Sequence, residues 1–96
     1  FPSADIMETK MQVEDTLKER GTRYGDFTDN ARVSQDFQIM IRSHPNYITL
    51  DHVKREALTV IMQKIARILN GDPNYRDNWH DIQGYAKLAE DRCSDI

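Results

Sequence analysis

Apolar residues recur at intervals of three and four along most of this chain, which is the spacing of one face of an α-helix. Glycine and proline interrupt the pattern at a few places and divide it into separate segments. These segments predict helices at about residues 8–20, 28–43, 51–70 and 75–92. The sequence therefore predicts an all-α fold, in which four helices joined by short loops form a compact domain.

The segment 51–70 carries the strongest helical pattern. Thr49 or Asp51 can cap its first turn, and the pair Asn70-Gly71 is typical of a helix end. A stripe of five apolar residues is expected to face the core. This stripe consists of Leu58, Ile61, Ile65, Ile68 and Leu69.

The segment 75–92 has two different faces. A glycine inside a helix costs about 1 kcal/mol relative to alanine, so Gly84 indicates that another chain element or a ligand comes close to its face. We expect a homodimer that buries this face around Gly84 and Leu88. The opposite face is expected to enter the core, with Trp79 as its anchor. It consists of Tyr75, Trp79, Ile82, Ala86, Ala89 and Cys93.

The remaining segments are shorter or weaker. Gly21 follows a basic last turn and is expected to end the first helix. The pattern places the domain at residues 8–96, with residues 1–7 as a disordered tail or non-native sequence. Residues 47–50 have β-type character but no partner strand.

Composition narrows the class of function. The chain has 13 basic and 16 acidic residues and a net charge of −3, which argues against binding to nucleic acid or to an anionic membrane. No apolar run approaches the ~20 residues of a membrane span. Cys93 is the only cysteine, which fits a reducing compartment. The mean hydropathy of −0.73 predicts half-solvated helices or a partner chain that completes the core.

The segment 20–27 is a candidate phosphate site. Two glycines four residues apart, next to Arg20 and Arg23, could direct backbone N–H and guanidinium groups towards a phosphate. In the alternative interpretation, the segment is a corner between helices. The glycines would then adopt positive φ, while Tyr24 and Phe27 pack onto the core.

Asp77 and Asp81 lie one helical turn apart and form a candidate magnesium site. Glu56 is the best candidate for a third acidic ligand, because it shares a helix stripe with Arg67. In the alternative interpretation, the aspartates only complement the positive end of the helix dipole.

Lys64 and Arg67 could form a cationic wall for phosphates. The alternative is a solvated helix face with ion pairs to Asp77 or Asp81. In both interpretations, Lys64 and Arg67 lie away from the main apolar stripe of the segment 51–70.

Three motifs together are fairly specific, and they resemble a family of small uncharacterised proteins of bacteriophages and prophages over residues 13–92. That family brings no established activity with it. The motifs are Arg20-Gly21-x-x-Tyr24-Gly25-Asp26, Lys64-Ile65-Ala66-Arg67 and Asp77-x3-Asp81-Ile82-x-Gly84-Tyr85-Ala86.

The last motif is also similar to the second acidic element of MazG-like all-α nucleotide pyrophosphohydrolases. This resemblance implies a MazG-like helical scaffold with Mg²⁺ bound between acidic helices. The first acidic element of those enzymes is Glu-x-x-Glu, and Lys64 and Arg67 stand in its place. Because ammonium and guanidinium groups have no lone pair for a metal, this inversion disfavours catalysis.

Two hypotheses for the function follow. In the first, the chain is a non-catalytic phage-type protein that binds a host protein or a nucleotide. In the second, it is a MazG-like, Mg²⁺-dependent nucleoside triphosphate pyrophosphohydrolase that binds Mg²⁺ through Asp77 and Asp81.

Overall fold

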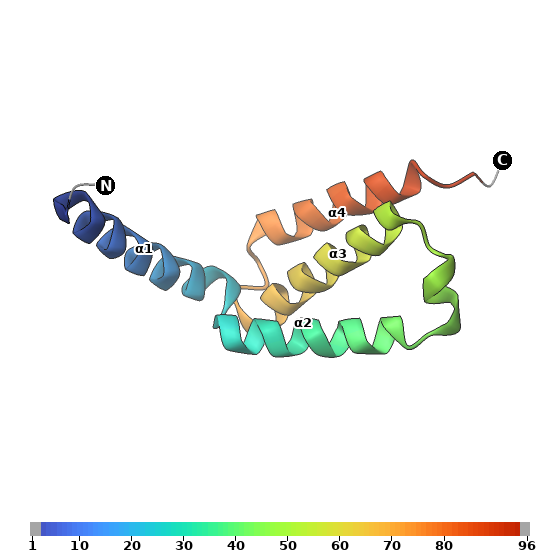
Figure 1. The fold of residues 1–96 in the computed structure, drawn as a ribbon, viewed down its shortest axis with the longest axis horizontal. Coiled ribbons are helices and arrows are strands. Elements are labelled where there is room, and N and C mark those ends of the chain that lie inside the picture. The colour runs from blue at the N-terminus through green and yellow to red at the C-terminus, as the bar shows by residue number, and fades with distance from the viewer. Residues whose placement is uncertain (1–2, 95–96) are drawn as a thin grey trace.

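The computed structural model describes residues 3–94, with side chains from residue 12 onward. Within this range no residue forms a strand, so the predicted all-α class is confirmed. The helices are α1 (Ser3–Tyr24), α2 (Phe27–Arg42), the 3-10 helix η1 (Pro45–Thr49), α3 (His52–Asn70) and α4 (Arg76–Glu90) (Figure 1).

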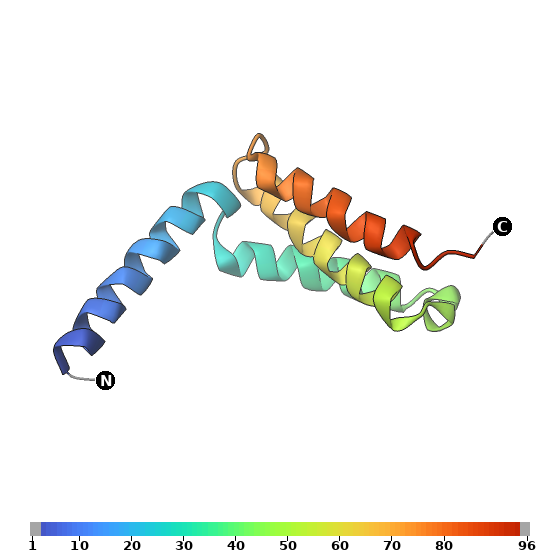
Figure 2. The ribbon, with the colours of Figure 1, turned by 90° about the horizontal axis from the view of Figure 1, so that it is seen from above.

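The helices α2, α3 and α4 form the body of the molecule, and α1 projects from it. α3 packs against both α2 and α4, whereas α1 meets the body only near its own C-terminal end (Figures 1 and 2). The longest dimension of the chain is 57 Å, about twice the other two. None of the described helices is long and apolar enough to cross a membrane.

The ends of α3 follow the predicted signals. The Asp51 side chain accepts a hydrogen bond from the backbone N–H of Lys54 at 2.8 Å, so it is the residue that caps this helix. At the other end, Gly71 N–H donates to the Arg67 carbonyl at 2.9 Å, and the helix ends at Asn70 as predicted.

The first helix is longer than predicted at both ends. It continues through Gly21 and ends at Tyr24, because Gly25, with a φ of +82°, is the residue that leaves the helical conformation. It begins at Ser3, inside the expected tail, and residues 1–2 of that tail lie outside the described range.

The segment with β-type character forms η1 instead of an extended strand. Pro45 occupies the first turn of η1, where its missing N–H is not needed. The His44 Nδ1 atom accepts a hydrogen bond from the backbone N–H of Asn46 at 3.1 Å. Local capping therefore overrides the β preference of residues 47–50.

The centre of the body contains smaller residues than predicted. Ala57, Met62 and Ala66 are the buried apolar residues of α3, while most of the expected stripe is half-buried and Leu69 is exposed. Alanines allow neighbouring helix backbones to approach closely, so the larger side chains lie at the edges of the contact.

The buried face of α4 also differs from the prediction. Asn78 is only 1% exposed, whereas Trp79 is 51% exposed and its indole N–H donates to the Pro73 carbonyl at 2.8 Å. Cys93 is exposed as well. The prediction of Trp79 as a core anchor is therefore wrong, because α4 turns the neighbouring polar residue towards the body.

Two loops meet at one corner of the molecule. Asp72 N–H donates to the Arg23 carbonyl at 2.9 Å, which ties the turn after α3 to the end of α1. A Cβ atom on Gly25 would lie only 2.4 Å from the Asn70 carbonyl oxygen, and one on Gly71 would lie 2.4 Å from the Arg23 oxygen. Both glycines are therefore required by close backbone contact.

Candidate functional site

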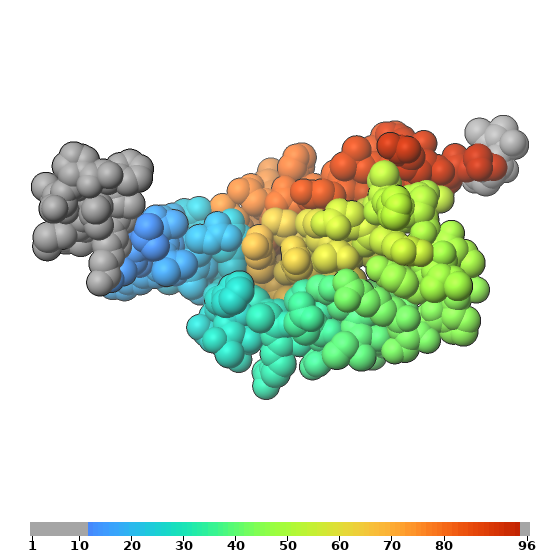
Figure 3. All heavy atoms as spheres, in the orientation of Figure 1, coloured from blue at the N-terminus to red at the C-terminus, as the bar shows by residue number. Residues whose placement is uncertain are grey.

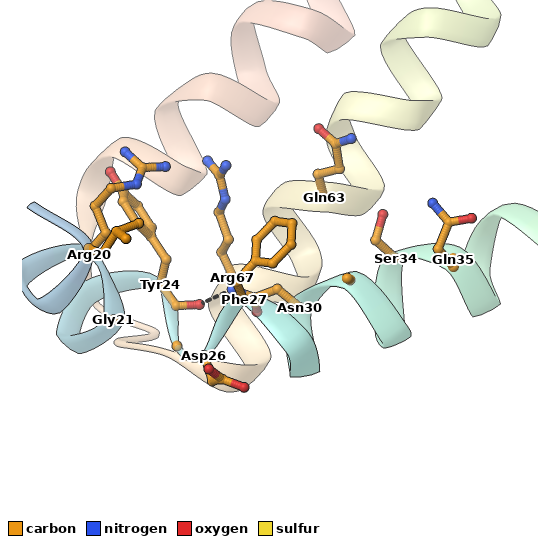
Figure 4. Close-up of a pocket in the computed structure, with 13 residues that line it drawn as sticks. Arg20, Gly21, Tyr24, Asp26, Phe27, Asn30, Ser34, Gln35, Gln63 and Arg67 are labelled. Atoms are coloured by element: carbon orange, nitrogen blue, oxygen red, sulfur yellow. Dashed lines mark hydrogen bonds between the residues drawn. The ribbon is translucent and has the colours of Figure 1, made fainter. Parts of the chain in front are cut away.

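A pocket of about 510 Å³ lies between α1, α2 and α3, beside the corner where the two loops meet (Figure 4). The last turns of α1 contribute Arg20 and Tyr24, the start of α2 contributes Phe27, and α3 contributes Arg67. Asn30 fixes the corner from α2, because its side-chain amide donates to the Tyr24 carbonyl at 2.6 Å.

Two arginines converge on Tyr24 in this pocket. The guanidinium carbon of Arg20 lies 4.7 Å from the centre of the Tyr24 ring, and that of Arg67 lies 4.9 Å from it (Figure 4). Among residues 12–94, no carboxylate lies within ion-pair distance of either guanidinium. The fold thus places two positive charges beside one ring and leaves both available to an anion.

Phe27 and Tyr24 do not behave alike, although both were expected to pack onto the core. Tyr24 is half-buried and packs edge-to-face on Tyr75, with ring centres 5.5 Å apart. Phe27 lines the pocket and is 82% exposed, so its ring is free to contact a ligand. The corner interpretation of residues 20–27 therefore holds for Gly25 and Tyr24 but not for Phe27.

Arg23, the other predicted phosphate ligand of the segment 20–27, does not line the pocket. It pairs with Glu19 at 2.9 Å and donates to the Tyr75 hydroxyl at 3.0 Å. The hydrogen bond to Tyr75 is the main reason why the pKa of Arg23 is raised. Its charge is therefore engaged within the chain.

Lys64 is engaged in a different contact, although it lies only one turn from Arg67. Its Nζ atom lies 2.8 Å from the Asp81 carboxylate, and this ion pair links α3 to α4. The Lys64 side chain is only 14% exposed. The hydrogen bond from Lys64 is the main cause of the lowered pKa of Asp81. For Lys64, the ion-pair interpretation is confirmed.

The three predicted magnesium ligands are not brought together. The Asp77 carboxylate accepts a hydrogen bond from the Tyr75 hydroxyl at 2.9 Å, and Asp81 binds Lys64. Glu56 is exposed and precedes Lys64 by eight residues, which is about 12 Å along α3. In the part of the chain with described side chains, no three acidic, histidine or cysteine residues are grouped to hold a metal. The residues present do not fit a Mg²⁺ site within one chain.

The predicted dimer face of α4 is open in the single chain. A Cβ atom on Gly84 would meet no heavy atom within 4 Å, and Leu88 is exposed. Gly84 therefore makes no close contact inside the chain, and the dimer remains a prediction.

The sequence interpretation missed Tyr24 and Phe27 as pocket residues. A signal for Tyr24 was present, because Arg20 and Tyr24 are four residues apart, the spacing that brings two side chains together on a helix. No comparable signal exists for Phe27, since its exposure depends on how α1 and α2 meet.

One comparison with known proteins covers almost the whole chain. A family model described as "Domain of unknown function (DUF6378)" matches residues 8–93, a range that contains both the pocket and the Lys64–Asp81 pair. No curated protein and no solved structure gives a match. The chain therefore belongs to the DUF6378 family, whose function is unknown.

Proposed function

We propose that this chain is a non-catalytic binding protein that holds a phosphorylated ligand, specifically a nucleotide, in the pocket between α1, α2 and α3. The observation that carries the proposal is the convergence of Arg20 and Arg67 on Tyr24 without a carboxylate partner in the described chain.

Guanidinium groups are well suited to phosphate, because their planar donors match two phosphate oxygens at once. The ring of Tyr24 lies next to both groups and limits the orientations that they can adopt. A ligand with two negative charges would relieve the repulsion between the two arginines. A phosphate or a diphosphate has this charge.

The surroundings of the arginines favour a nucleotide over inorganic phosphate. The exposed Phe27 ring offers a face on which a base can stack, a contact that is worth about 1–3 kcal/mol. The side-chain amides of Gln35 and Gln63 line the same pocket and can bond to a base edge (Figure 4). A volume of about 510 Å³ is typical of small-molecule sites.

The alternative is a MazG-like, Mg²⁺-dependent pyrophosphohydrolase. It is supported by the position of Asp77 and Asp81 one turn apart on α4. Catalysis would require the Lys64–Asp81 ion pair to open and further carboxylates to arrive from outside the chain. We therefore rank this function second.

The motif resemblance supports two further parts of the proposal. The protein would act in the bacterial cytoplasm as a phage- or prophage-type accessory protein. A host protein is the other class of ligand that this resemblance allows, and it would be recognised by surfaces outside the pocket.

Titration calorimetry of the full chain with ADP, without metal, tests the proposal. We expect saturable binding that Arg67→Gln weakens at least tenfold, because a charge-assisted contact worth 1.4 kcal/mol or more is lost. Arg76→Gln, an exposed residue at the start of α4 with the same change in charge, is the control and should bind like the parent. Absence of binding, or equal loss in both variants, would contradict the proposal.

Activity is tested separately. The protein is incubated with Mg²⁺ and nucleoside triphosphates, and pyrophosphate release is compared with that of Asp81→Ala. We expect no turnover above this control. Robust release that Asp81→Ala abolishes would establish the hydrolase instead.

A further inference from the structure

The projecting helix α1 has almost no packing partner within the chain. It is 22 residues long, and every side chain from residue 12 to residue 23 is exposed. In proteins most helical stability comes from packing one face of the helix against other elements. Figures 1 and 2 show that only the C-terminal end of α1 meets the body. The exposed length of α1 is therefore a candidate docking surface.

An apolar strip runs along α1 towards the pocket. Val13 and Leu17 lie one turn apart on one face, and Leu17 is 62% exposed. Leu17 lines the pocket together with Phe27 and Ala31 of α2, so the strip continues across the inner side of the angle between the two helices. A second helix laid along this strip would cover apolar groups from both α1 and α2.

The charges of α1 identify a suitable second helix. Among the described side chains of α1, residues 12–15 contain two acidic residues and no basic residue, whereas residues 16–24 contain three basic residues and one acidic residue. In an antiparallel pair centred between Val13 and Leu17, Glu14 and Asp15 lie close to the two-fold axis, within one helical turn of the partner's Lys18. The two helix dipoles would also oppose each other favourably. A parallel arrangement would place like charges together.

We infer that α1 pairs antiparallel with the α1 of a second copy of this chain, around Val13 and Leu17. A two-fold axis relates the copies, so each residue of the patch meets the same patch on its partner. The copy also covers the outer edge of the pocket at Leu17. The inference does not depend on the ligand proposed above.

Light scattering on the full chain tests the pairing. The expected mass is twice the chain mass of 11.2 kDa. Val13→Glu/Leu17→Glu should give a monomer, because it places charges in the apolar strip. Leu88→Glu on the open face of α4 is the matched control and should remain a dimer. A monomeric parent at 0.3 mM (about 50 times a typical low-micromolar Kd), or dissociation by Leu88→Glu alone, would overturn the inference.

A mixing experiment tests the antiparallel orientation. Glu14→Lys/Asp15→Lys gives residues 12–24 a net positive charge, and Lys18→Glu/Arg20→Glu gives them a net negative charge. Each variant alone should dimerise at least tenfold more weakly, while an equimolar mixture should form a one-to-one dimer. A mixture that remains monomeric, with both variants folded by circular dichroism, would refute antiparallel pairing.

The outcomes for the dimer and for the ligand can be separated. Arg67→Gln should leave the mass of the dimer unchanged, since Arg67 lies on α3. If Arg67→Gln loses ADP binding and remains a dimer, the pairing of the α1 helices is supported. An intact parent dimer that never binds ADP would refute the proposed ligand and leave the pairing supported.

Discussion

Lys64 and Arg67 lie one turn apart on the same helix, yet they belong to regions of opposite character. Lys64 faces α4 and is neutralised by Asp81 at 2.8 Å. Arg67 contacts the ring of Tyr24 on α1, a ring that Arg20 also contacts. The α3–α4 contact is thus electrically closed, and the α1–α2–α3 pocket is open to an anion. The neighbouring helix, and not the spacing along α3, decides what each basic residue does.

The largest effect on stability should come from disrupting the corner beside the pocket, where Gly25 meets Asn70. Gly25→Val places a Cβ where the Asn70 carbonyl lies at 2.4 Å, in a backbone with a φ of +82°. We expect a loss of about 3 kcal/mol or more in the free energy of unfolding, measured by urea denaturation, together with loss of ADP binding.

Gly21→Ala is the matched control for this glycine. Gly21 lies inside α1, and a Cβ there meets no heavy atom within 4 Å. Its replacement should stabilise the chain by up to about 1 kcal/mol. Equal destabilisation by both substitutions would show that the corner has no special role.

A smaller effect is expected at the closed region. Asp81→Asn leaves the mostly buried Lys64 ammonium without its counter-charge, and we expect a loss of about 1–2 kcal/mol at pH 7. Urea denaturation of both proteins measures this difference. ADP binding should change little, because Asp81 does not line the pocket.

The same pair predicts a pH dependence with a definite sign. The pKa of Asp81 in the folded chain is below its ordinary value of 3.8. Its contribution to stability is therefore complete above pH 3.8 and is lost as the pH falls through the lower, folded-state pKa. The difference between parent and Asp81→Asn should shrink over that range. A difference that grows on acidification would contradict the ion pair.

Arg67→Gln should affect stability less than Asp81→Asn does. The guanidinium contacts the Tyr24 ring at a partly exposed site, where such contacts contribute about 0.5–1 kcal/mol. Removing one of two like charges offsets part of this loss. A thermal melt should therefore show a small shift, while ADP binding falls at least tenfold. A large loss of stability would assign Arg67 a structural role.

The smallest effect on stability is expected at Phe27. Its ring is 82% exposed, so Phe27→Ser should change the free energy of unfolding by no more than about 0.5 kcal/mol. Binding of ADP should weaken more than binding of inorganic pyrophosphate, because only ADP has a base to stack. Equal weakening of both ligands would exclude the stacking role.

The fold was predictable where the signal is local. Asp51 and the Asn70-Gly71 pair mark the ends of α3, because a side-chain cap and a helix-ending glycine each act on the nearest turn alone. The buried face of α4 was not predictable in this way. Trp79 is the more apolar residue, yet α4 buries Asn78 and leaves Trp79 half exposed, because the rotation of α4 against the body decides which face is covered.

The site was predictable in its residue types and not in its grouping. Arg20 and Arg67 were both candidates for phosphate binding, and the structure brings these two together. Arg23 and Lys64 have the same charge, but different partners engage them. Glu19 lies four residues before Arg23 on α1, a spacing that the sequence contains. The pairing of Lys64 with Asp81 depends on the rotation of α4 about its axis, which no spacing within one segment contains.

The corner that joins Arg23 and Gly25 to Asn70 and Asp72 also constrains the order in which the pocket can be made. Arg23 and Gly25 are synthesised well before Asn70 and Asp72. The contacts between α3 and α4 also require residues 76–90, which are synthesised after this corner. A nascent or truncated chain that ends before Gly71 therefore has both arginines but lacks the turn that holds them around Tyr24.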